Sequence, residues 1–183
     1  MRRPLLLALA CFAFAAAVLI VAAAGLPERA AFTGVINPGD TRSTAPEIGA
    51  FAPPFAASLL DGDTLSLNSL RGSPVILNFW ATWCEPCEVE MPELQAFYEA
   101  YPQVHLIGIN LAEPPALIHA WMDARGLNFP TVLDLDGRIA RDYALRGQPT
   151  TYILSPNGVI AHIFFGVTTR AALENVVLPL IVG

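Results

Sequence analysis

Two cysteines separated by two residues give the clearest chemical signal in the chain. Cys84 and Cys87 stand in the sequence WCEPC, directly after the apolar run 74–80. Residues three apart share one face of a helix, so the two sulfurs can close and reopen a disulfide without unfolding of the segment. At a helix start, free N–H groups and the helix dipole stabilise a thiolate. The spacing predicts redox chemistry in which Cys84 attacks and Cys87, one turn further in, resolves.

Other uses of a cysteine pair stay open at this point. A structural zinc site needs four ligands, whereas His105, His119 and His162 are scattered through the chain. A purely structural disulfide stabilises little across so short a loop. The alternative functions are a copper-handling module, in which the two thiolates hold Cu(I), and a thiol peroxidase. A peroxidase favours Thr or Ser three residues before its reactive cysteine, where this chain has Ala81. We therefore expect no metal and no cofactor beyond a redox-active disulfide.

The elements that must position the pair alternate between strands and helices. Residues 74–80 are typical of a strand buried on both faces, and residues 85–101 show helical apolar spacing with acidic first turns and a kink near Pro92. We expect an α/β fold, in which helices flank both faces of a mixed sheet. The predicted elements are a hairpin over 58–67, strands over 74–80, 104–111, 131–135, 150–154 and 159–164, and helices over 85–101, 116–125, 137–143 and 168–181.

The N-terminal segment predicts export and membrane attachment. Leu5 to Ala24 contains no charged side chain and is long enough to cross a bilayer core of about 30 Å. Arg2 and Arg3 precede it, so the positive-inside rule places the rest of the chain outside the cytoplasm. A cleaved signal peptide would also export the chain, but the length of the run favours an uncleaved anchor. Cys11 lies inside this run and is expected to be a small apolar residue without a partner.

Composition divides the chain into three predicted parts and excludes one class of partner. We expect a signal-anchor transmembrane helix over 1–25, a flexible tether over 26–47, where Ala, Pro, Gly, Thr and Ser predominate, and a folded domain over 48–183. The net charge is −6 and no basic stripe is visible. Nucleic acid is therefore not an expected partner.

The cysteine motif and its surroundings resemble a known family. The sequences VILNFWATWCEPC at 75–87 and EMPEL at 90–94 are similar to the TlpA/ResA-like, membrane-tethered branch of thioredoxins. The resemblance extends over about residues 47 to 183, because GQPTTY at 147–152 falls where thioredoxins have their cis-proline loop. It implies a thioredoxin fold with an N-terminal hairpin extension, and an extracytoplasmic thiol-disulfide oxidoreductase.

The resemblance also implies roles for individual residues. Pro149 is expected to be cis and to lie beside the disulfide, with the backbone of Gln148 holding a substrate peptide and Trp83 contributing to the same surface. Glu90, three residues after Cys87, is expected to be the acid/base that moves protons during exchange. Asn78 occupies the place of the buried acid of cytosolic thioredoxins.

Charge and family resemblance together favour a reductant. Glu85, Glu88 and Glu90 oppose a thiolate, so the thiol form should give up electrons readily. The family implies exported substrates with cysteine pairs, such as apocytochrome c or copper-site proteins. It also implies a membrane thiol transporter of the CcdA/DsbD type as electron donor. We expect a single-pass protein of the cell membrane with its catalytic domain on the extracytoplasmic side.

Overall fold

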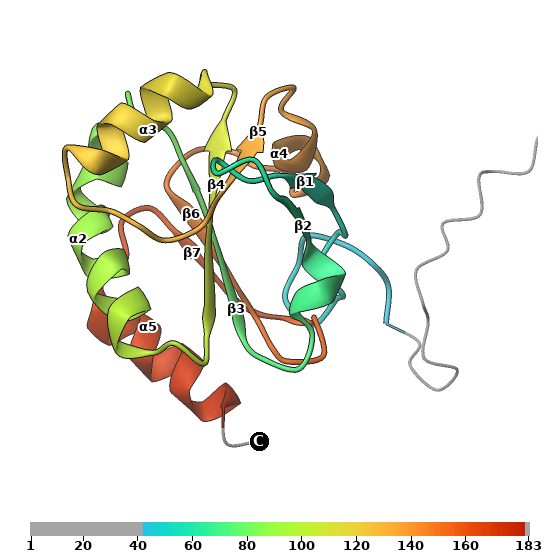
Figure 1. The fold of residues 1–183 in the computed structure, drawn as a ribbon. Helices are drawn as coiled ribbons and strands as arrows, with labels where there is room; N and C mark the ends of the chain where they lie inside the picture. Colours follow the sequence, from blue (N-terminus) through green and yellow to red (C-terminus); the bar gives the residue numbers. More distant parts are fainter. Residues whose placement is uncertain (1–41, 182–183) are drawn as a thin grey trace, which may run out of the picture. The chain divides into compact units, whose positions relative to one another are not determined.

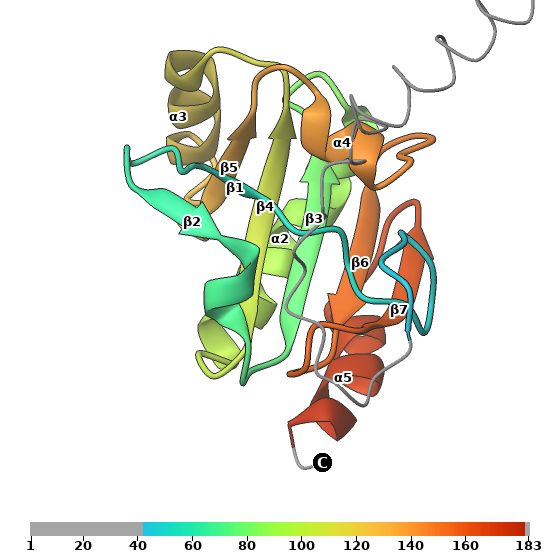
Figure 2. The same ribbon diagram turned by 90° about the vertical axis from the view of Figure 1, so that its right-hand side faces the viewer.

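A five-stranded mixed sheet forms the centre of the domain in the computed structural model, which describes residues 42–181. The strands lie in the order β5-β4-β3-β6-β7, side by side in Figure 2. The first three of these run parallel to one another, whereas β6 is antiparallel to β3 and β7 is antiparallel to β6. Their bounds are β3 Val75–Trp80, β4 His105–Leu111, β5 Thr131–Asp134, β6 Thr150–Leu154 and β7 Ile160–Phe165.

Helices cover both faces of the sheet, as predicted (Figure 1). The helices α2 (Glu85–Ala100), α3 (Pro115–Asp123) and α5 (Arg170–Val177) pack on one face. The opposite face is covered by α4 (Arg138–Asp142), the 3-10 turn η1 (Leu67–Leu70) and the predicted N-terminal hairpin, which consists of β1 (Ala56–Ser58) and β2 (Thr64–Ser66). A second 3-10 turn, η2 (Leu178–Leu180), follows α5.

The central strand β3 determines which side chains lie beneath α2. All its residues are buried, and alternate side chains point to opposite faces. Ile76 and Trp80 belong to the apolar cluster under α2, whereas Leu77 and Phe79 belong to the cluster on the other face. Asn78 therefore points toward α2, and it is the polar residue of this otherwise apolar strand.

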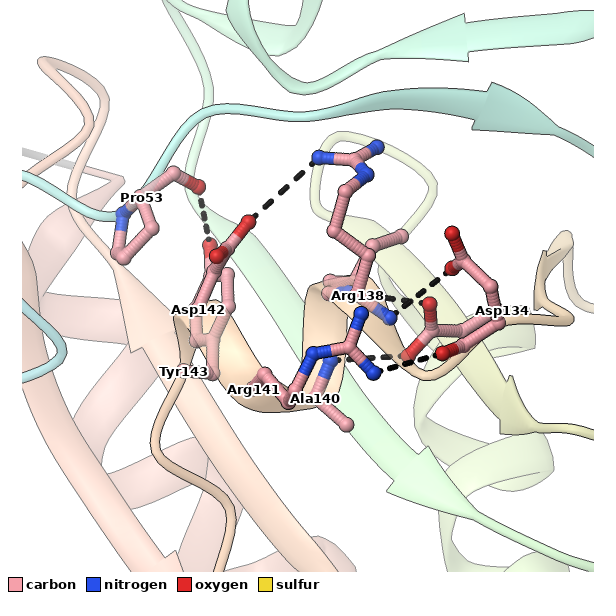
Figure 3. A network of polar contacts seen from close by, with 9 residues as sticks. Pro53, Asp134, Arg138, Ala140, Arg141, Asp142 and Tyr143 are labelled. Atoms are coloured by element: carbon pink, nitrogen blue, oxygen red, sulfur yellow. Dashed lines mark hydrogen bonds and ion pairs between the residues drawn. The ribbon is translucent and has the colours of Figure 1, made fainter.

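Buried polar contacts join the N-terminal segment to the second face. The hydroxyl of Tyr143 donates to the carbonyl of Pro53 at 3.0 Å, and the hydroxyl of Tyr152 donates to the carbonyl of Tyr143 at 2.8 Å. Figure 3 shows Tyr143 directed at Pro53, with the carboxylate of Asp134 beside the first turn of α4. Asp134 accepts the backbone N–H groups of Ile139 and Ala140 and so caps this short helix.

Several boundaries differ from the sequence expectation. The end of the predicted tether joins the domain, since Phe51 donates to the carbonyl of Ser43 and accepts the N–H of Ala45. The final helix is shorter than expected, because Pro179 falls in η2. The helix α2 is continuous through Pro92, as expected, and the kink near Pro92 stays a prediction. Within residues 42–181, no helix is long and apolar enough to cross a membrane. The predicted anchor 1–25, with Cys11, and most of the predicted tether lie outside the described residues.

The buried hydroxyl of Tyr143 provides a test of the packing. Tyr143→Phe removes the donor to Pro53 and leaves a buried carbonyl without it, so the free energy of unfolding should fall by about 1–2 kcal/mol. Tyr98→Phe is the matched control, because the hydroxyl of Tyr98 makes no hydrogen bond within the described part of the chain. Denaturant unfolding of both variants checks this, and equal losses would contradict the assigned role of Tyr143.

Candidate active site

Cys84 and Cys87 form a disulfide at the N-terminus of α2. Cys84 is the N-cap residue, and its sulfur accepts the backbone N–H of Cys87 at 3.2 Å. The side chains differ in accessibility: Cys84 is 4% exposed, and Cys87 is completely buried. The neighbouring Trp83 is 69% exposed. An incoming group can therefore reach Cys84 more easily than Cys87.

The local sequence explains why a helix begins at this point. The chain leaves β3 at Trp80, and the N–H of Cys84 turns back to the carbonyl of Ala81 at 3.2 Å. Pro86 occupies the first turn of α2, where a missing N–H has no cost and the fixed φ suits the helix. Glu85 and Glu88 place negative charge near the positive end of the helix dipole.

Glu90 is a fully buried carboxyl group on the same helix. Its Oε1 accepts the side-chain N–H of Asn78 at 2.7 Å, and its Oε2 accepts the backbone N–H of Thr168 at 3.0 Å. Burial raises the pKa of Glu90 from 4.5 to about 7, although the hydrogen bonds from Thr168 and Asn78 act in the opposite direction. Glu90 can therefore take up or release a proton near neutral pH.

Asn78 connects the carboxyl group of Glu90 to the neighbouring strand β6. Its amide donates both to Glu90 and to the hydroxyl of Thr151 on β6, at 2.9 Å. Thr151 and Thr168 were not among the residues predicted from the sequence to belong to the site. Alternation along β6 places Thr151 on the same face as Ile153, which is the signal that could have found it. Thr168 precedes α5, and only the tertiary fold brings it to α2.

The loop before β6 lies at the same end of the sheet as the disulfide. The Gln148–Pro149 peptide bond is cis, as the resemblance implies. Thr150 pairs with Phe79, near the end of β3, so Pro149 lies close to the point where the chain turns toward Cys84. Pro149 is buried and Gln148 half-buried. Contacts of Trp83, Gln148 and Pro149 with a substrate remain predictions.

A second buried carboxyl group, that of Glu113, bonds to the cysteine loop, and no sequence pattern indicated it. Glu113 is 6% exposed and accepts three hydrogen bonds: from the N–H of Thr82 at 2.7 Å, from the hydroxyl of Thr82 at 2.5 Å, and from the side chain of Asn110 at 2.7 Å. Ala112, directly before it, has φ of 55°, a left-handed conformation that costs an L-residue about 1–2 kcal/mol. The glutamate therefore holds Thr82, two residues before Cys84.

The arrangement can perform thiol-disulfide exchange. It joins a redox-active sulfur pair at a helix N-terminus to a buried carboxyl group that titrates near neutral pH. Among residues 42–181, no group of three or more His, Cys, Asp or Glu side chains is arranged to hold a metal ion.

The buried carboxyl group predicts a specific pH dependence of stability. The pKa of Glu90 is higher in the folded protein than its ordinary value of 4.5, so protonation of Glu90 stabilises the folded protein. This stabilisation is fully present below about pH 4.5 and is lost as the pH rises through about 7. Glu90→Gln stays neutral at every pH. The advantage of wild type over Glu90→Gln should therefore decline by about 3 kcal/mol from about pH 4 to about pH 8.

Denaturant unfolding of the oxidised protein measures this decline, because cysteines in a disulfide do not titrate. Glu85→Gln is the control, since it removes the same charge from an exposed position near the disulfide. That variant should keep the wild-type pH dependence. Parallel curves for wild type and Glu90→Gln would show that Glu90 does not titrate in this range.

Comparisons with known proteins agree with this chemistry. Residues 48–163 match the model of the AhpC/TSA family. The chain is 35% identical over 137 residues to the thiol-disulfide oxidoreductase ResA of Geobacillus thermodenitrificans, covering 74% of this chain and 79% of the relative.

Two solved structures are similar over most of their own length. A putative thiol:disulfide interchange protein DsbE from Chlorobium tepidum aligns with a TM-score of 0.69 and 27% identity, covering 75% of this chain and 99% of that one. A secreted disulfide oxidoreductase of Mycobacterium tuberculosis aligns with a TM-score of 0.63 and 27% identity, covering 68% and 95%. The thioredoxin fold and the thiol-disulfide oxidoreductase activity expected from the sequence are thereby confirmed. The chain belongs to the AhpC/TSA family and, within it, to the ResA-like thiol-disulfide oxidoreductases.

Proposed function

We propose that this oxidoreductase reduces disulfide bonds in exported proteins, with Cys84 as the attacking thiol and Cys87 as the resolving thiol. The observation that carries the proposal is the sulfur pair at the start of α2, in which Cys84 is 4% exposed and Cys87 is fully buried, close in sequence to the buried carboxyl group of Glu90. A helix N-terminus favours the thiolate that attack requires.

The proposed reaction transfers two electrons to the substrate. The Cys84 thiolate attacks one sulfur of the substrate disulfide, forms a mixed disulfide and releases the other substrate sulfur as a thiolate. Cys87 then gives its proton to the Glu90 carboxylate and attacks the Cys84 sulfur. The second substrate thiolate leaves, and the enzyme disulfide forms. The two substrate thiolates take up protons, one of them supplied by Glu90, so the substrate ends as a dithiol.

The charges around the pair favour the reducing direction. Glu85 and Glu88 are exposed in the first turn of α2, and Glu90 is buried one turn later. Negative charge near a thiolate destabilises it, and an unstable thiolate makes the reduced form a better electron donor. Arg125 offsets part of this charge, because its guanidinium lies 2.7 Å from the carboxylate of Glu88.

Export and membrane attachment complete the proposal. One similar structure is described as secreted, and the apolar run 5–24 behind Arg2 and Arg3 supports export followed by retention as an anchor. A reductant outside the cytoplasm must itself be reduced, and a membrane thiol transporter of the CcdA/DsbD type is the proposed donor. Apocytochrome c, with its closely spaced cysteines, is the proposed substrate.

Trapping of the mixed disulfide tests the substrate and the order of attack. Cys87→Ser lacks the resolving thiol, so it should stay covalently linked to its exported substrate through Cys84. The linked proteins are identified by mass spectrometry after non-reducing electrophoresis, and Cys84→Ser is the matched control. Trapping by Cys84→Ser alone would reverse the two roles. If neither variant traps a protein and the reduced wild type binds one Cu(I), the function would be copper handling instead.

Glu90→Gln provides a separate kinetic prediction. Loss of the negative charge should increase the thiolate fraction of Cys84 at neutral pH, yet loss of the proton carrier should slow turnover by about 10²-fold or more. The thiolate is followed by its ultraviolet absorbance, and turnover by reduction of a CxxCH peptide disulfide across pH. Glu85→Gln should change the thiolate fraction slightly and leave turnover unchanged. Equal turnover of Glu90→Gln and wild type would remove Glu90 from the mechanism.

A further inference from the structure

We propose that Glu113 is a positioning residue that fixes the loop 81–84 and thereby sets the reactivity of Cys84. The inference rests on the proposed role of Cys84 as the attacking thiol. Glu113 lies outside the disulfide and the Glu90 cluster, and the mechanism above does not use it. It is nevertheless a buried carboxylate bonded to the chain two residues before the reactive sulfur.

The three hydrogen bonds of Glu113 hold Thr82 at two of its atoms. One carboxylate oxygen accepts the backbone N–H of Thr82 and the amide of Asn110, and the other accepts the hydroxyl of Thr82. Fixing both the backbone and the side chain of one residue removes most of its freedom. The loop is also anchored at each end, because Ala81 is fully buried and Cys84 donates to its carbonyl.

The glutamate is itself held by the sheet and not by the helix that carries the disulfide. Asn110 pairs with Trp80 across the parallel strands β4 and β3, so both strands end side by side where the loop begins. The left-handed Ala112 then turns the chain after β4, and its N–H donates to the carbonyl of Asp134 on β5. Glu113 therefore fixes the cysteine loop relative to the sheet.

A glutamine at this position separates geometry from charge. Its carbonyl oxygen can keep the N–H of Thr82 and the amide of Asn110, while its NH₂ group donates to the hydroxyl of Thr82, which accepts in place of donating. Glu113→Gln can thus preserve all three contacts without the charge. Glu113→Ala leaves the buried amide of Asn110 and the two part-buried donors of Thr82 without their acceptor, and it releases the loop.

Alkylation of the reduced full-length protein measures the reactivity of Cys84 directly. The rate constant of iodoacetamide with Cys84 is mapped by mass spectrometry across pH, so that the thiolate fraction and the reactivity of the thiolate are obtained separately. We expect Glu113→Ala to lower the thiolate rate constant and the kcat of insulin reduction by about tenfold or more. Glu113→Gln should stay within about threefold of wild type in both.

Asp134→Ala is the matched control. Asp134 is also a buried carboxylate at the end of a neighbouring strand, but its carboxylate accepts the N–H groups of Ile139 and Ala140 and caps α4. This variant should lose stability and keep the wild-type reactivity of Cys84. If Glu113→Ala does not fold, Thr82→Val serves in its place, because it removes the hydroxyl and keeps the backbone N–H. Thr82→Val should also lower the alkylation rate constant of Cys84, by a smaller factor than Glu113→Ala.

Three results would overturn the proposal. The first is a wild-type alkylation rate of Cys84 in Glu113→Ala, or in Thr82→Val if the alanine variant does not fold. The second is an equal loss of Cys84 reactivity in Asp134→Ala, and the third is a failure of Glu113→Gln to restore the alkylation rate. Failure of the proposed function looks different. In that case the wild type would be alkylated at Cys84 with the expected dependence on Glu113, while the trapping variants captured no exported protein.

Discussion

The burial of the Glu90 carboxyl group is the constraint on which the site depends. An ionised carboxylate in an apolar interior is costly, so the group must find donors, move its pKa toward neutral, or both. Here the fold supplies Asn78 from the central strand and the N–H of Thr168 from the loop before α5. These contacts join α2, β3 and the loop before α5 at one point. Burial outweighs these hydrogen bonds and raises the pKa of Glu90 to about 7, which suits proton transfer to and from thiols.

Two opposing electrostatic effects act on the Cys84 thiolate of the reduced pair. The N-terminus of α2 favours a thiolate at Cys84, whereas Glu85 and Glu88 in the same turn oppose it. Because Cys84 is 4% exposed and Cys87 is completely buried, an incoming group can reach Cys84 more easily than Cys87. Glu90 accepts a hydrogen bond from Asn78 on β3, and Glu113 accepts one from Asn110 on β4. Glu113 also holds the cysteine loop through Thr82, whereas Glu90 lies on α2, three residues after Cys87.

Local spacing in the sequence predicted the strand and the helix that carry the cysteine pair. Helical periodicity placed Glu90 on the face of Cys87, and family resemblance indicated the cis bond at Pro149. The contact between Glu90 and Thr168 joins residues 78 positions apart, and no local pattern reports it. Glu113 follows a left-handed Ala112, a position where sequence patterns favour glycine, so its turn back toward the cysteine loop was not foreseeable. The ordered residues 43–47 were likewise missed, because their backbone contacts are formed with a neighbouring loop and leave no periodicity.

The proposed mechanism depends on proton exchange near neutral pH by the carboxyl group of Glu90, which lies on α2, three residues after Cys87. Carbon-13 NMR of the glutamate carboxyl groups measures this directly in the oxidised protein, with Glu90→Gln identifying the resonance by its disappearance. This resonance should move with a midpoint near pH 7. A midpoint near the ordinary value of 4.5 would contradict the proposed proton exchange by Glu90.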